Sequence, residues 1–72
     1  MNKNELKAEM LRHGDTGGML ADYLGMARST FSAKINETNG AEFTQGEIAK
    51  IKFKYDLNAE ALDTIFFSQV VS

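Results

Sequence analysis

The residues best suited to catalytic chemistry stand together near the start of the chain, where His13 precedes the glycine-rich run GDTGG (14–18). A histidine can act as a general base or bind a metal ion, and a glycine-rich loop can surround a phosphate group. This is the only histidine, the chain has no cysteine, and the run lacks the Lys-Ser/Thr pair of a phosphate-binding loop. The chain also has no Ser-His-Asp pattern. The sequence therefore predicts no enzyme, no metal site and no cofactor.

A second stretch, residues 17–36, has the spacing of two short helices joined by a tight turn. Ala21 is small enough for a second helix to cross it closely, and Gly25 can adopt a backbone conformation that other residues resist. Met26 and Phe31 are apolar and stand where side chains would fill the gap between the helices. These four positions together predict a helix-turn-helix, a motif whose second helix enters the major groove of DNA.

Several segments resemble the repressor and Cro proteins of temperate phages, which belong to the large xenobiotic-response-element-like family of helix-turn-helix regulators. The segments are ARSTFSAKIN (27–36), EFTQGEIAKI (42–51) and IFF (65–67), and the resemblance covers roughly residues 4–67. It implies an all-α, five-helix domain like that of lambda repressor. It also implies a homodimer that reads a pseudo-palindromic operator in double-stranded DNA.

The length of 72 residues and the acidic balance are also similar to those of the modulator of repression in the genetic switch of some lactococcal phages. That similarity implies a different partner, the phage's own CI-type repressor. Two functions therefore stay open. One is a Cro-like regulator that reads operator DNA in the lysis–lysogeny switch. The other is an anti-repressor that binds the repressor and has only weak DNA binding of its own.

The family resemblance implies that the recognition helix begins near Arg28. A guanidinium can form two parallel hydrogen bonds with guanine, a contact worth about 1–3 kcal/mol of discrimination between bases. The hydroxyl side chains that follow could bond bases or phosphates, Ala33 could offer a methyl contact to thymine, and Lys34 and Asn36 suit phosphates. The predicted DNA-contacting residues are Arg28, Ser29, Thr30, Ser32, Ala33, Lys34 and Asn36.

The chain departs from the family pattern at the start of the motif. Gly17 and Gly18 stand where many members place a glutamine that holds a phosphate. Only the backbone N–H groups there, together with Thr16, could then contact a phosphate. Ala27 replaces the usual Ser or Thr cap of the recognition helix. These departures predict weak DNA binding by a single copy.

Charge is unevenly distributed along the chain, although its formal net value is only −2. Between Tyr23 and Asn36 there are two basic residues and no acids, whereas from Tyr55 onward there are three acids and no base. Because phosphate neutralisation dominates DNA affinity, a second copy or a more basic partner is expected to assist binding. Asp15 and Asp22 are expected to be surface acids. The residues that could meet a protein partner are Asp15, Asp22, Tyr23 and Arg28.

Five helices are expected to position these residues. Their predicted caps are Asn4, Thr16, the Thr44–Glu47 capping box and Asn58. The expected spans are 4–13, 17–24, 28–36, a helix after Thr44 and the segment ALDTIFF (61–67). The expected inward side chains include Leu6, Met10, Leu11, Ile48, Ile51, Ile65 and Phe66, while Lys50, Lys54, Val70 and Val71 are expected to face outward.

Length and composition predict one domain over residues 1–72, with its core in 4–67 and a tail at 68–72. No apolar run approaches the roughly 20 residues that a membrane span needs. The first residues lack the continuous apolar core of a signal peptide. We therefore expect a cytoplasmic protein of a bacterial host cell that has no membrane partner.

Overall fold

Four α-helices of the computed structural model begin at a side chain that accepts a hydrogen bond from the first helical turn. The structure describes residues 1–67, which are all-helical and contain no strand. The α-helices are α1 (Lys3–Arg12), α2 (Gly17–Leu24), α3 (Arg28–Ile35), α4 (Gln45–Tyr55) and α5 (Ala59–Leu62). A 3₁₀ turn at Thr38–Gly40 follows α3, and a π-helical turn at Asp63–Phe67 continues α5.

Most of the helix N-caps are the residues that the sequence predicted. Thr16, Asn58 and the Thr44–Glu47 capping box are confirmed as predicted. The prediction of Asn4 as the first cap is wrong, because Asn4 lies inside α1. Asn2 takes the role instead: its backbone is extended, and its side-chain oxygen accepts a hydrogen bond from the Glu5 N–H at 3.3 Å.

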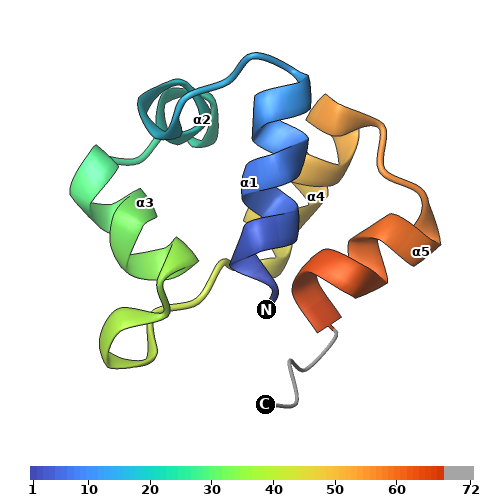
Figure 1. Ribbon diagram of the computed structural model, residues 1–72. Helices are drawn as coiled ribbons and strands as arrows, with labels where there is room; N and C mark the ends of the chain where they lie inside the picture. Colours follow the sequence, from blue (N-terminus) through green and yellow to red (C-terminus); the bar gives the residue numbers. More distant parts are fainter. Residues whose placement is uncertain (68–72) are drawn as a thin grey trace.

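Figure 1 shows α1 at the centre, with α2 and α3 on one side, α5 on the other, and α4 behind it. The Asn2 N–H donates to the Ile65 carbonyl at 2.7 Å, which ties the start of α1 to the end of the described chain. The buried core draws on every α-helix except α5, together with loop and π-turn residues. It comprises Leu6, Met10, Leu20, Ala21, Leu24, Phe31, Ile35, Phe43, Ile51, Tyr55, Leu57 and Ile65.

One core prediction is wrong in a way that matters for the site. Leu11 was expected to share a face with Leu6 and Met10, yet it is 81% exposed. Leu6 and Met10 are four residues apart and lie on one face of a helix with 3.6 residues per turn, whereas Leu11 is rotated away from Leu6. Phe66 is partly buried against the core, and Val70 and Val71 lie outside the described residues.

Within residues 1–67, no helix combines the length and the apolar character needed to cross a membrane.

Candidate nucleic-acid interface

The turn Gly25–Ala27 joins α2 to α3 and sets their relative orientation. Gly25 has φ 74° and ψ 32°, in the left-handed region that favours glycine. The Met26 N–H donates to the Ala21 carbonyl at 3.0 Å and closes the end of α2. Ala21 and Phe31 are buried in the core, and Met26 packs against it. The spacing therefore predicted the local packing of these helices, while DNA binding by the pair stays a prediction.

The first two turns of α3 carry the predicted base-contacting side chains, most of which are exposed to solvent. Arg28, Ser29, Thr30 and Ser32 are all exposed, and Ala33 is half-buried. Ala27 has an extended backbone and makes no side-chain cap, so the first N–H groups of α3 are not occupied by a neighbouring side chain. This end of the helix can therefore offer a guanidinium, two hydroxyls and backbone donors to a ligand.

Arg28 lies directly against the double glycine at the start of α2. A Cβ atom built on Gly18 would stand 2.5 Å from the Arg28 Nε and 2.7 Å from its Cζ, which is closer than real Cβ contacts come. A Cβ atom built on Gly17 would stand 3.6 Å from the Phe31 ring, an ordinary van der Waals contact. Gly18 is thus required by the observed position of Arg28, while Gly17 is not. The sequence predicted only backbone contacts to phosphate at these two glycines, and not the approach of Arg28 to Gly18.

Thr16 stays exposed at the same helix start, where its hydroxyl oxygen accepts a hydrogen bond from the Met19 N–H at 3.2 Å. The hydroxyl proton is not used by that bond, so it can still be donated to a phosphate oxygen. Thr16, Gly17 and Gly18 therefore keep the geometry of an anion-facing helix N-terminus.

Lys34, predicted to contact phosphate, is held by an intramolecular ion pair. Its ammonium lies 2.7 and 3.0 Å from the two carboxylate oxygens of Glu47, and its side chain is only 18% exposed. Burial alone would raise the pKa of Glu47, but hydrogen bonds from Lys34 and the Thr44 N–H outweigh it and hold that pKa below its ordinary value. The pair fastens α3 to the start of α4.

Asn36 caps the far end of α3. Its amide donates to the Ser32 carbonyl at 2.9 Å, and its side-chain oxygen accepts a hydrogen bond from the Lys3 ammonium at 3.0 Å. All three side chains are exposed. Asn36 therefore brings a lysine of α1 to the end of the predicted recognition helix.

Asp15 is not the surface acid that the sequence predicted. Its side chain is only 8% exposed; it accepts a hydrogen bond from the Tyr55 hydroxyl at 2.6 Å and lies 3.5 Å from the Lys54 ammonium. Burial, reinforced by the Asp15 carboxylate, raises the pKa of Tyr55 well above its ordinary value, so the phenol stays a proton donor. Asp15 is therefore bonded within the fold, and contact between Asp15 and a protein partner stays a prediction.

Lys54 was expected to face outward, and this expectation is also wrong. Its side chain is partly covered and reaches toward Tyr23 of α2. The Lys54 ammonium lies 4.8 Å from the centre of the Tyr23 ring, a cation–π distance, and its side chain is 27% exposed. Asp22 and Tyr23 are exposed, as a partner-binding role would require.

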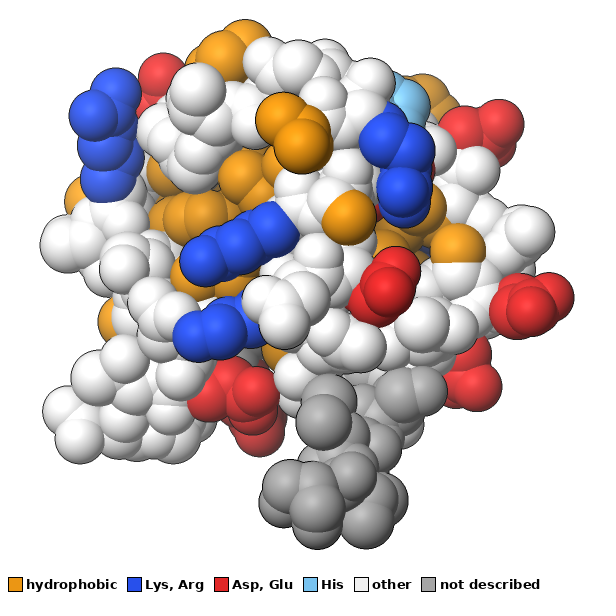
Figure 2. Space-filling model, in the orientation of Figure 1, with side chains coloured by type: hydrophobic (Ala, Val, Ile, Leu, Met, Phe, Trp, Pro, Cys, Tyr) orange, Lys and Arg blue, Asp and Glu red, His pale blue; other side chains and the backbone are white. Residues whose placement is uncertain are grey.

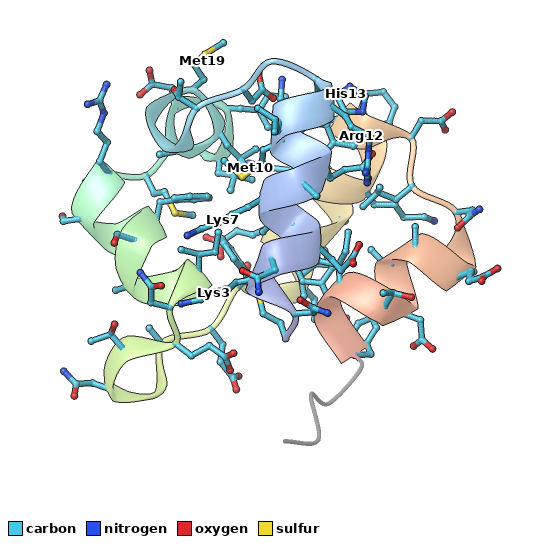
Figure 3. The ribbon with its side chains drawn as sticks, viewed as in Figure 1. Lys3, Lys7, Met10, Arg12, His13 and Met19 are labelled. Carbon is cyan, nitrogen blue, oxygen red and sulfur yellow. The ribbon has the colours of Figure 1, made fainter. Side chains whose placement is uncertain are left out.

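Sequence reasoning missed two lysines on α1. Figure 3 shows Lys3 and Lys7 reaching from α1 toward α3, and Figure 2 shows basic side chains around an exposed apolar area on this face. Neither Lys7 nor Arg28 takes part in the ion pairs formed within residues 1–67. The signal was present in the sequence: Lys3, Lys7 and Leu11 are spaced four residues apart and fall on one stripe of α1.

Over the described part of the chain, no group of three or more His, Cys, Asp or Glu side chains is placed to hold a metal ion. His13 instead stacks on Tyr55, with ring centres 4.6 Å apart, and its Nε2 lies 3.3 Å from a Glu9 carboxylate oxygen. Comparison with known proteins gives no relative: no family model, no curated protein and no solved structure matches this chain significantly. The function is therefore inferred from the geometry of these residues.

Proposed function

We propose that this chain is a DNA-binding transcriptional regulator, Cro-like in action, that reads an operator with the first turn of α3. The observation that carries the proposal is the exposure of Arg28, Ser29 and Thr30 at the start of a helix that follows α2 across a left-handed glycine. In helix-turn-helix proteins the N-terminal residues of the second helix contact base edges in the major groove.

Phosphate contacts would orient the chain on the duplex. The free first turn of α2, at Gly17 and Gly18, offers backbone N–H groups at the positive end of a helix dipole. Two lysines of α1 add cations: Lys7 lines the same hollow as Arg28, and Lys3 bonds Asn36 at the far end of α3. Lys34 contributes little, because Glu47 already neutralises it. With so few cations, we expect weak binding by one copy and tighter binding by a homodimer.

A guanidinium placed against a helix N-terminus also favours an anion. Arg28 and the N–H groups of α2 both carry positive character, and among residues 1–67 no carboxylate pairs with Arg28. A phosphate would satisfy both, whereas the O6 and N7 atoms of guanine would bond Arg28 alone, after its side chain moves away from Gly18.

The alternative function is an anti-repressor that binds a CI-type repressor and blocks or alters its DNA binding. It is favoured by the shortage of unneutralised cations and by the exposed apolar side chains Leu11 of α1 and Met19 and Tyr23 of α2. Both functions use Arg28, so the test must separate DNA from protein as the partner.

The experiment begins with selection of bound duplexes from a random DNA library, followed by mobility shifts across a salt series. A Cro-like regulator shifts the selected duplex alone, with affinity that falls steeply as salt rises. The matched variants are Arg28→Ala and Lys52→Ala, the second an exposed lysine on α4 outside the interface. If no duplex is enriched, yet the chain changes the mobility shift of a phage repressor added with it, the DNA-reading proposal fails and the anti-repressor function replaces it.

A further inference from the structure

A hollow of about 570 Å³ opens between α1, α2 and α3. Its floor is apolar and consists of Met10, Phe31 and Ile35, which belong to the core. Gly17 and Gly18 form part of its wall and have no side chains to fill it. Its volume falls within the roughly 300–1,000 Å³ typical of ligand-binding clefts.

The rim of the hollow is basic. Lys7 and Arg28 line it, and both stay outside the ion pairs formed by the described residues. Asp15 also lines it, but Tyr55 and Lys54 already hold the Asp15 carboxylate. Leu11, one helical turn after Lys7, extends the apolar surface outward. Figure 2 shows the basic side chains bordering this apolar area.

Phosphates of DNA would satisfy the two cations but would leave Leu11 and the small exposed part of the apolar floor in contact with water. An apolar side chain covers them and gains free energy in proportion to the area removed from water. Acidic groups beside that side chain would then meet Lys7 and Arg28 across the rim. Both features occur together on an amphipathic helix, and such helices are known ligands of apolar grooves on protein surfaces.

We propose that this hollow is a docking site for a helix of a partner protein that presents one large apolar side chain flanked by carboxylates. The docking goes beyond the DNA-reading function and does not require it. One consequence does depend on that function: a helix in the hollow covers Arg28, so partner and DNA exclude each other. The hollow would then be the place where a protein regulates DNA binding.

The test uses the ¹⁵N-labelled chain and a designed helical peptide of roughly 15 residues, long enough to hold some helix in water. The peptide carries one central leucine with glutamates four residues before and three residues after it. We expect chemical-shift changes at Leu11, Gly17, Gly18 and Arg28. Peptides with serine in place of the leucine, or lysines in place of the glutamates, should bind at least about tenfold more weakly.

Two variants of the chain locate the binding. Leu11→Ser should weaken peptide binding by about tenfold, because the leucine of the peptide loses its apolar contact with Leu11. Phe53→Ser is the matched control: Phe53 is 84% exposed on α4, away from the hollow, and its loss should change nothing. Neither residue is a predicted DNA contact, so both variants should keep the DNA affinity of the parent chain.

Three results overturn the docking proposal. They are the absence of shifts in the hollow at about 1 mM peptide, equal binding of the serine peptide, and equal loss of binding in both chain variants. The DNA-reading function is tested separately. If the peptide binds but no duplex is enriched, the docking proposal stands and the DNA-reading proposal fails. If a duplex is enriched but the peptide does not displace it, only the proposed competition between partner and DNA fails.

Discussion

Two sets of charged residues differ in what surrounds them. Asp15, Lys34 and Glu47 are largely covered by protein and bonded to partners on other elements. Lys7 and Arg28 border an open hollow and take part in none of the ion pairs within residues 1–67. Covered and bonded charges act on the fold, whereas charges left facing solvent beside an apolar surface are available to a ligand. Substitutions in the two sets should therefore change different quantities.

The largest expected effect is on DNA binding by Arg28→Ala. Loss of a bidentate contact to guanine should weaken binding to a selected duplex by about 5–150-fold, equivalent to about 1–3 kcal/mol. The free energy of unfolding should change little, because the side chain is exposed. Mobility shift and urea denaturation measure the two quantities. A stable variant that binds DNA as the parent does would place Arg28 outside the interface.

The Tyr55→Phe substitution should lower the free energy of unfolding and leave DNA binding unchanged, the reverse of Arg28→Ala. It removes the hydrogen bond to the covered Asp15 carboxylate and should lower the free energy of unfolding by about 1–3 kcal/mol, while DNA binding at low denaturant is retained. Tyr23→Phe is the control, because no hydrogen bond of the Tyr23 hydroxyl is present within the described chain. Equal stability of the two variants in urea would show that the Asp15–Tyr55 bond contributes nothing.

A pair of glycine substitutions tests the position of Arg28. Gly17→Ala fits against Phe31 and should stabilise the chain by up to about 1 kcal/mol through its higher helix propensity. Gly18→Ala has the same propensity gain but collides with the Arg28 side chain, which must move. We expect the Arg28 Nε resonance to shift in Gly18→Ala only. Identical spectra for both variants would mean that Arg28 does not lie against Gly18 in solution.

The smallest effect concerns the Lys34–Glu47 ion pair and its dependence on pH. Because the pKa of Glu47 is lowered in the folded chain, its contribution to stability is present above the ordinary value of 4.5 and is lost as pH falls through the lowered pKa. Glu47→Gln should remove that contribution, about 0.5–1 kcal/mol for a partly exposed pair. Urea denaturation at neutral and acidic pH measures it. The difference between parent and variant should shrink toward acidic pH, and a constant difference would contradict the assignment.

Features that depend on neighbours within a few residues could be predicted from the sequence alone. Thr16, Thr44 and Asn58 were predictable caps because each bonds an N–H three residues onward, and Gly25 was predictable because few other residues accept its backbone angles. The all-α class followed from the same local signals. The misplaced first cap, Asn4 for Asn2, shows that two candidate caps so close together cannot be ranked from their types alone.

The packing of the helices determines which charges are bonded within the fold and which are left for a ligand. Asp15 meets Tyr55 from 40 residues away, and Lys34 meets Glu47 from 13 residues away. Arg28 reaches Gly18 across a turn, and Lys3 and Lys7 join the same face from α1. These contacts depend on the angles at which helices pack, and those angles are set by the shapes of side chains buried between them. No local pattern records that geometry, so the sequence predicted where α3 begins but not what surrounds it.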